Sequence, residues 1–172
     1  MTNHAAERVR LENELRLALT RKEVEVHFQP QVVLASGRIV GMEALARWRH
    51  PQRGWIPPAQ FIPVADASNL IHPLGELVLA QACRQVRAWE RAGLPALRVG
   101  INVSARQLGS LGFARTVAGA LRVAALDPAR VQLEVRQDVL VENPDGTLPV
   151  LKQLKAAGVQ IAVTDFGADR PG

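Results

Sequence analysis

The second half of this chain alternates short apolar segments with longer amphipathic ones, and this alternation limits the folds open to it. Strands are predicted at residues 98–103, 131–135 and 160–164, and helices at residues 113–124 and 147–157 lie between them. A strand–helix–strand unit of this length places its two strands in parallel and its helix outside the sheet. The alternation therefore predicts an α/β fold built on a parallel sheet.

An antiparallel hairpin is predicted ahead of these units. Residues 25–29 form its first strand, which Pro30 is expected to end, and residues 39–48 form its second. The turn between them, at residues 35–38, is too short for a parallel connection, so the two strands are antiparallel. Residues 50–58 are rich in proline and are expected to form a loop.

Two further helices complete the predicted secondary structure. One covers residues 73–92, where Gly93 ends it, and the other covers residues 5–19. The latter is either a lone surface helix or a linker that continues from an upstream domain. We expect residues 1–20 to form an N-terminal linker helix and residues 21–172 to form the main domain.

The length of the chain sets a limit on the sheet. A closed (β/α)₈ barrel takes roughly 250 residues, whereas this chain has 172. About five strands are predicted, which is too few to close a barrel. We expect an incomplete, TIM-barrel-like fold in which residues 160–164 form an unpaired edge. The inner face and the helix-facing apolar stripe are expected to be partly exposed, which favours a homodimer or a protein partner that covers the open barrel.

The composition argues against several functional classes. The chain carries 21 Lys and Arg against 16 Asp and Glu, but the basic residues are scattered and aromatic residues make up only 4%, so no nucleic-acid binding is expected. No apolar run approaches the roughly 18 residues of a membrane span. The single cysteine, Cys83, lies on an apolar helical face, where a buried, unreactive thiol is expected, and it favours a reducing compartment. We expect a cytoplasmic protein without a membrane span.

Period-two alternation predicts which strand residues face the inside of the barrel. In residues 98–103 the apolar side chains share one face, which leaves Asn102 on the other, and in residues 131–135 the same pattern leaves Glu134 opposite. Because the helix-facing side of a parallel barrel is apolar, Asn102 and Glu134 are expected to point into the barrel near the carboxyl ends of their strands. Enzymes with this fold place their chemistry at that end.

Two more oxygen donors are expected at the same level. Glu43 lies on the second hairpin strand, on the face that it shares with Arg47, and Asp165 follows the last strand directly. With Asn102 and Glu134 they present four oxygen donors from four strands, which suits a hard cation such as Mg²⁺, Mn²⁺ or Ca²⁺. The alternative for each residue singly is a surface or hydrogen-bonded polar side chain.

At these residues the chain resembles the EAL domain family, whose members bind and hydrolyse the bacterial second messenger cyclic di-GMP. The resemblance runs from about Leu15 to Gly167, and the helix before Leu15 resembles the linker that joins EAL domains to an upstream sensor or diguanylate cyclase domain. The motifs that carry it are Phe28-Gln29-Pro30, Glu43-Ala44-Leu45, Arg47-Trp48, His50-Pro51, Pro58, Phe61-Ile62-Pro63, Asn102-Val103-Ser104, Gln107-Leu108, Leu133-Glu134-Val135 and Asp165-Phe166-Gly167.

The resemblance implies a modified TIM barrel with an antiparallel first strand, and a phosphodiesterase that uses two metal ions, Mg²⁺ or Mn²⁺. The metal ligands that it implies are Glu43, Asn102, Glu134 and Asp165. The nucleotide contacts that it implies are Gln29, Glu43, Leu45 and Arg47. In that set Arg47 is the cationic partner of a phosphate. Trp48 is expected to pack in the core.

The chain departs from the family pattern at the metal site. Catalytic members carry two adjacent aspartates before Phe-Gly, and here the first is Thr164, whose neutral hydroxyl cannot replace a carboxylate that bridges two divalent ions. A second family glutamate is replaced by Gln137, and Arg136 is added beside it. The family's loop after Gly167 gives way to residues 168–172, and its catalytic lysine and later glutamate and glutamine would lie further downstream.

Three functional hypotheses follow. The chain is an inactive EAL module that binds cyclic di-GMP or a protein partner, an active phosphodiesterase that hydrolyses the nucleotide to linear pGpG, or a truncated fragment without an independent role. The altered metal site favours the first hypothesis over the second, because the loss of even one oxyanion-hole donor slows an enzyme about 100- to 1000-fold.

Overall fold

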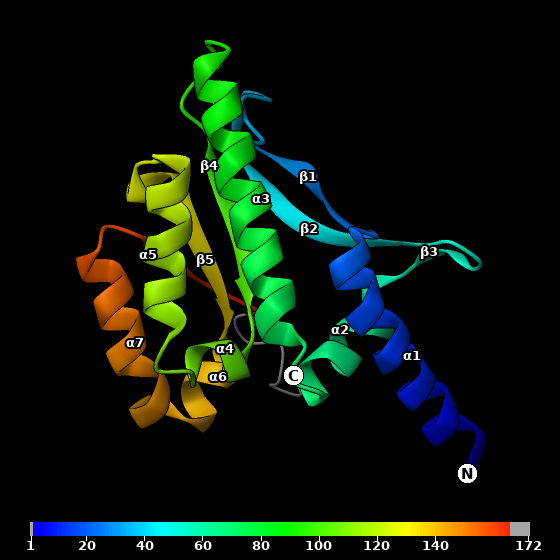
Figure 1. The fold of residues 1–172 in the computed structure, drawn as a ribbon. Coiled ribbons are helices and arrows are strands. Elements are labelled where there is room, and N and C mark those ends of the chain that lie inside the picture. Colours follow the sequence, from blue (N-terminus) through cyan, green and yellow to red (C-terminus); the bar gives the residue numbers. More distant parts are fainter. Residues whose placement is uncertain (1, 166–172) are drawn as a thin grey trace.

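The computed structural model describes residues 2–165 of the chain (Figure 1). Its elements, in chain order, are α1 (Thr2–Arg21), β1 (Val24–Val32), β2 (Ile39–His50), β3 (Gly54–Ile56), α2 (Pro58–Ala67), α3 (Ile71–Arg91), β4 (Arg98–Val103), α4 (Ala105–Leu108), α5 (Phe113–Ala124), the 3₁₀ turn η1 (Pro128–Arg130), β5 (Val131–Arg136), α6 (Gln137–Glu142), α7 (Pro144–Ala156) and β6 (Gln160–Thr164). The motif residues Phe166 and Gly167, and residues 168–172, lie outside the described residues.

The sheet has the predicted mixture of one antiparallel and several parallel pairings. Its main path runs β1-β2-β4-β5-β6, and the short strand β3 pairs with β2 off this path. β1 is antiparallel to β2, whereas β2, β4, β5 and β6 run parallel to their neighbours. Within residues 2–165, β1 and β6 are the two ends of this path, so the sheet is an incomplete barrel. The α/β, TIM-barrel-like prediction is confirmed.

The helices α3, α5 and α7 cover one face of the sheet (Figure 1). In β4 and β5 every second side chain points toward these three helices. The side chains that do so are at most 6% exposed. These side chains are Val99, Ile101, Val103, Val131, Leu133 and Val135. Cys83 of α3 is buried, as predicted, and burial raises the pKa of its thiol to about 11.

The opposite face of the sheet is polar and open. The strand register places on it the side chains of Glu25, His27, Gln29, Gln31, Glu43, Arg47, Arg98, Asn102, Gln132, Glu134, Arg136, Gln160 and Thr164. Most of these side chains are exposed or half-buried. The helix-facing stripe is exposed at the edge strand β6, where Val163 is 45% exposed. The inner face is therefore exposed as predicted, but its surface is hydrophilic.

The prediction that Pro30 ends the first strand is wrong. β1 continues to Val32, and Pro30 pairs with Met42 of β2. Within the described residues β1 pairs with β2 alone, so one side of the strand has no ladder partner. An edge strand tolerates proline because the missing N–H can lie on that unpaired side.

The proline-rich stretch at residues 50–58 is not a simple loop. Gly54 adopts a left-handed φ of 71°, which lets the chain turn back so that β3 pairs with the end of β2. Pro58 then starts α2, since proline suits the first turn of a helix. Trp48 packs against Phe61 of α2 with ring centroids 5.7 Å apart, and both are fully buried, so Trp48 is a core residue as predicted.

The N-terminal helix α1 is attached to the body of the domain. Leu11, Leu15 and Ala18 form its buried face. On its polar side Arg53 forms ion pairs with Glu7 at 2.8 Å and with Glu14 at 3.3 Å. These contacts fix α1 against the β2–β3 hairpin, while its role as a linker stays a prediction.

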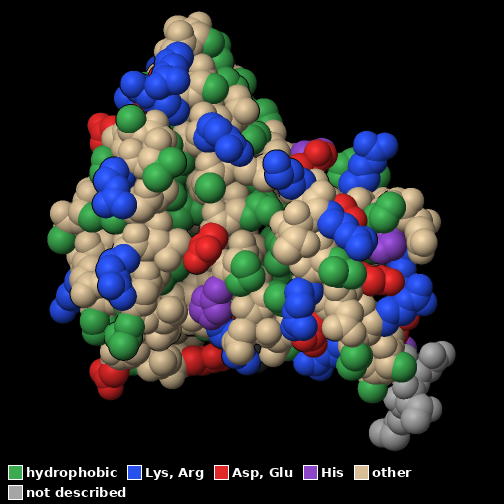
Figure 2. All heavy atoms as spheres, viewed as in Figure 1, with side chains coloured by type: hydrophobic (Ala, Val, Ile, Leu, Met, Phe, Trp, Pro, Cys, Tyr) green, Lys and Arg blue, Asp and Glu red, His purple; other side chains and the backbone are tan. Residues whose placement is uncertain are grey.

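The surface in Figure 2 shows Lys and Arg side chains distributed over several elements, without a continuous basic stripe. Within residues 2–165 none of the helices combines the length and the apolar character that a membrane crossing requires.

Candidate functional site

Three predicted site residues come together on the open face of the sheet. Glu43 of β2 is opposite Gly100 of β4, and Asn102 of β4 is opposite Glu134 of β5. Asn102 Nδ2 donates a hydrogen bond to Glu43 Oε1 at 3.0 Å. Adjacent parallel strands thus place two carboxylates and one amide side by side.

Glu134 is the most enclosed of the three, with 8% exposure. Burial raises the pKa of Glu134, and the negative charge of Glu43 raises it further. Hydrogen bonds from Gln31 and Gln132 act in the opposite direction. The charged form of Glu134 is therefore disfavoured in the folded protein, chiefly by burial and then by the neighbouring charge of Glu43.

Two residues that the sequence reasoning missed hold Glu134 in place, one by a hydrogen bond and one by leaving space for it. Gln31 of β1 donates from Nε2 to Glu134 Oε1 at 3.4 Å. Gly100 lies beneath the same carboxylate, where a Cβ atom would clash with it. A glycine inside a strand is a signal of close approach that the sequence does contain. The contact between Gln31 and Glu134 joins residues far apart in the chain, and strand alternation alone does not predict it.

A cavity of about 560 Å³ opens at the carboxyl ends of these strands. Four predicted residues line it, namely Leu45, Arg47, Asn102 and Glu134. Its other walls come from α2, α3, α4 and α6. A volume of this size is typical of sites for small organic ligands. One guanidinium nitrogen of Arg47, Nη1, donates to the carbonyl of Ala46 at 2.9 Å.

Glu43 and the remaining predicted residues do not line this cavity. Gln29 is exposed on β1, opposite Glu43 in the antiparallel register. Asp165 is exposed and has a left-handed φ of 55° directly after β6. Thr164 ends β6 opposite Arg136 of β5.

Arg136 lines the same cavity together with Asp138 at the start of α6. Arg136 Nε donates to Asp138 Oδ1 at 3.0 Å, and Nη2 donates to Oδ2. This two-pronged ion pair lowers the pKa of Asp138, with the hydrogen bond from Arg136 as the main cause. The guanidinium is thereby held at the rim of the cavity.

The donors fit one hard cation better than two. Glu43, Asn102 and Glu134 offer oxygen ligands of the kind that Mg²⁺ and Mn²⁺ prefer, and a cation would offset the burial and the repulsion by Glu43 that together raise the pKa of Glu134. Across residues 2–165 no cluster of three Asp, Glu, His or Cys side chains is arranged to hold a metal ion. Thr164 adds no carboxylate, so a second ion lacks an acidic ligand at this position.

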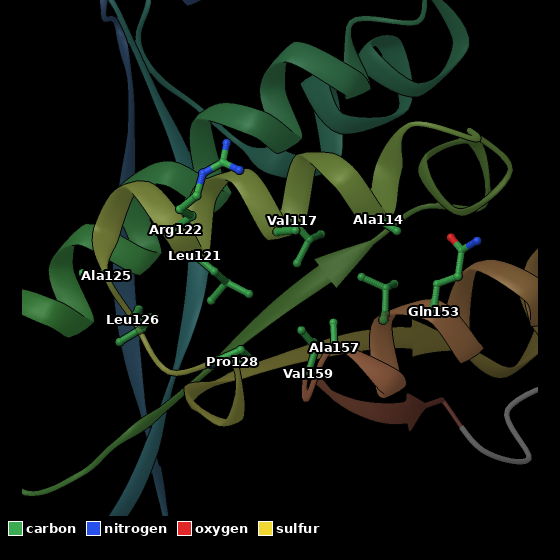
Figure 3. A pocket seen from close by; sticks show the side chains of 12 residues that line it. Ala114, Val117, Leu121, Arg122, Ala125, Leu126, Pro128, Gln153, Ala157 and Val159 are labelled. Carbon is green, nitrogen blue, oxygen red and sulfur yellow. The ribbon is translucent and has the colours of Figure 1, made fainter.

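A second cavity, of about 320 Å³, lies on the helical side of the molecule. Figure 3 shows its walls, which come from α5, α7 and the segment leading into β5. Its lining is almost wholly apolar, with Arg122 and Gln153 at the margin. It lacks the converging polar groups of the first cavity, which is therefore the candidate site.

Comparison with known proteins places these features in a family. The EAL domain family model matches residues 12–172. The chain is 41% identical over 167 residues to the bifunctional diguanylate cyclase/cyclic di-GMP phosphodiesterase MucR of Pseudomonas aeruginosa, covering 97% of this chain and 24% of MucR. It is 40% identical over 163 residues to the cyclic di-GMP phosphodiesterase NbdA of the same species, covering 95% of this chain and 21% of NbdA. The chain thus spans about a quarter or less of these relatives.

Solved structures show the same relationship. A c-di-GMP complex of the PaMucR phosphodiesterase superposes with a TM-score of 0.89 at 40% identity, covering 95% of this chain and 66% of that one. The EAL enzyme Bd1971, in a form bound to cAMP and cyclic di-GMP, superposes with a TM-score of 0.88 at 28% identity. The superposition covers 96% of this chain and 46% of that one. This chain belongs to the EAL domain family.

Proposed function

We propose that this chain is a cyclic di-GMP-binding module of the EAL family in which hydrolysis is lost or strongly reduced. The observation that carries the proposal is a contrast within one site. The cavity keeps Leu45, Arg47, Asn102 and Glu134 on its walls, whereas Thr164 replaces a carboxylate at the end of β6.

The binding half of this proposal rests on the chemistry of the cavity. Arg47 offers a guanidinium to a phosphodiester, and Leu45 offers an apolar contact beside it. Asn102 is held by Glu43, so its amide is oriented before a ligand arrives. Relatives named as cyclic di-GMP phosphodiesterases, and a related structure in complex with c-di-GMP, support this choice of ligand.

The loss of turnover rests on the number of acidic ligands. Phosphodiester hydrolysis with two metal ions requires carboxylates that hold both ions and orient the attacking water. Glu43, Asn102 and Glu134 would hold one Mg²⁺ or Mn²⁺ ion, which would neutralise charge on a bound phosphate. Thr164 provides a hydroxyl where a bridging carboxylate is needed, so the described residues support binding better than bond cleavage.

Binding and hydrolysis should be measured on one purified sample. We expect isothermal titration calorimetry to detect cyclic di-GMP binding, and chromatography to detect little or no pGpG with either Mg²⁺ or Mn²⁺. Turnover in the ordinary enzyme range, about 1 s⁻¹ or faster, would overturn the loss of activity. An absence of binding at high micromolar nucleotide would overturn the proposed ligand.

The variant Thr164→Asp tests whether the missing carboxylate at residue 164 limits metal binding. It restores a carboxylate next to Asp165 and leaves the residues that line the cavity unchanged. We expect it to increase the affinity of the protein for Mn²⁺. An unchanged Mn²⁺ affinity would show that residue 164 does not contribute to the metal site.

A further inference from the structure

The side chain of Gln31 reaches the candidate site across two strands. Gln31 lies on β1 and Glu134 on β5, and β2 and β4 stand between them in the sheet. The Gln31 amide nevertheless donates from Nε2 to Glu134 Oε1 at 3.4 Å. Gln31 is half-buried, so the bond is partly shielded from water. A residue on an end strand of the sheet thus contacts a predicted metal ligand.

Two glycines leave the path of this side chain open. Gly41 is opposite Gln31 on β2, and a Cβ atom there would lie 2.9 Å from Gln31 Oε1. Gly100 lies on β4, where a Cβ atom would lie 3.6 Å from Gln31 Nε2 and would clash with the Glu134 carboxylate. A glycine inside a strand marks such a close approach. Both glycines therefore serve the contact between Gln31 and Glu134.

An irregularity in β1 follows Gln31 directly. Gln31 pairs with Gly41, whereas Val32 pairs with Ile39, so the register shifts between these two residues of β1. A bulge of this kind changes the direction of a neighbouring side chain. The bulge and the two glycines thus act on the same side chain.

The bond from Gln31 holds Glu134 near a second negative charge. Gly100, over which the Glu134 carboxylate lies, is level with Glu43 on β2. Two carboxylates in this arrangement repel each other. Gln31 holds one of them by its hydrogen bond, and Asn102 holds the other. The two amides therefore keep both carboxylates in place against their repulsion.

We propose that Gln31 is a positioning residue for the cation site, which holds the Glu134 carboxylate beside Glu43 so that the two can share one divalent cation. The inference rests on the proposed function, because the cation is the one that Glu43, Asn102 and Glu134 would hold. A hydrogen bond to a ligating carboxylate fixes its orientation, and the loss of such a partner typically lowers metal affinity about 10- to 100-fold. Since the bond from Gln31 is long, we expect the lower end of this range.

The test is titration of the full chain with Mn²⁺, in which electron paramagnetic resonance measures the free ion. Gln31→Met keeps the length of the side chain and removes its donor, and we expect the affinity for Mn²⁺ to fall about 10-fold. Gln160→Met is the matched control, because Gln160 is exposed on the same face of the sheet, level with Gln132. Its affinity should equal that of the unmodified chain. Thermal unfolding of each variant shows whether the fold is intact.

A second measurement separates positioning from packing. In the unmodified chain, Mg²⁺ should shift the NMR resonances of the Gln31 side-chain amide, because the carboxylate that accepts its hydrogen bond would bind the cation. The side-chain amide of Gln81 on α3, whose Oε1 accepts from the backbone N–H of Val26 at 3.1 Å, should keep its resonances. A Gln31 side chain that served packing alone would not respond to Mg²⁺.

The outcomes distinguish this inference from the proposed function. If Gln31→Met bound Mn²⁺ as tightly as the unmodified chain or more tightly, the role of Gln31 would be wrong and the proposed function would stand. An equal loss in Gln31→Met and Gln160→Met would also overturn that role. If the unmodified chain bound no Mn²⁺, the cation site of the proposed function and this inference would both be wrong.

Discussion

Asn102 donates a hydrogen bond to Glu43 across the junction of β4 and β2, and its backbone is level with that of Glu134 on β5. The neutral amide therefore contacts one carboxylate, and its neighbour on the next strand carries a second. Replacing it with a third carboxylate tests how much negative charge the site tolerates.

We expect Asn102→Asp to lower the free energy of unfolding by about 0.5–1.5 kcal/mol in EDTA, because it loses the solvent-exposed hydrogen bond to Glu43 and adds repulsion. Mg²⁺ should restore part of this loss, since the variant offers three carboxylates to the cation. Urea unfolding with and without Mg²⁺ measures both effects. Asn13→Asp, on the exposed side of α1, makes the same chemical change away from the site and should alter stability by about 0.5 kcal/mol or less. A loss of similar size in both variants would contradict the prediction.

The raised pKa of Glu134 predicts a pH dependence of stability. The folded protein retains the Glu134 proton at pH values where the unfolded chain has released it, so the folded state binds more protons in this window. The contribution of Glu134 to the free energy of unfolding is therefore fully present below the ordinary glutamate pKa and is lost as pH rises through the raised value.

Urea unfolding between about pH 4 and pH 7 measures this contribution. Glu134→Gln should show a shallower decline of stability over that range than the unmodified chain. Glu43→Gln should show an intermediate decline, because it removes the neighbouring charge and leaves the effect of burial. If the free energy of unfolding fell equally with pH in the unmodified chain and in Glu134→Gln, the attribution of this pH dependence to Glu134 would be refuted.

Much of the fold could be predicted because it depends on local periodicity. The predicted helix at residues 113–124 coincides with α5, and the predicted strand at residues 160–164 coincides with β6. The alternation in β4 and β5 also placed Asn102 and Glu134 on the open face. These features require only the side-chain pattern of one segment at a time.

The features that the sequence did not predict depend on contacts between distant segments. Pro30 is compatible with β1 because that strand is an edge, which one segment cannot reveal. The bond from Gln31 to Glu134 and the space left by Gly100 arise only when β1, β4 and β5 are assembled. The pairing of Arg136 with Thr164 likewise follows from the β5–β6 register.

Gly100 is required for space rather than for backbone conformation. A methyl group there would collide with the Glu134 carboxylate, which would have to move away from its present position over Gly100. We expect Gly100→Ala to lower the free energy of unfolding by about 1–3 kcal/mol and to weaken cyclic di-GMP binding.

The matched control is Gly119→Ala in α5, where the added methyl group meets open space. In a helix this change should raise the free energy of unfolding by about 0.5–1 kcal/mol. Urea unfolding compares the two variants directly. If Gly100→Ala were as stable as the unmodified chain, the proposed contact with Glu134 would be wrong.

Cys83 provides a test of how firmly α3 packs on the sheet. Its thiol is buried, and burial raises its pKa to about 11, so at neutral pH the reactive thiolate is scarce and out of reach. We expect iodoacetamide to leave the folded protein unmodified at pH 7 and to label it fully in urea, as measured by intact-mass spectrometry. Removing a buried side chain next to Cys83, as in Val86→Ala, loosens the same helix and should speed the labelling without urea. Rapid labelling of the unmodified folded chain would show that the layer formed by α3 opens far more readily than its burial indicates.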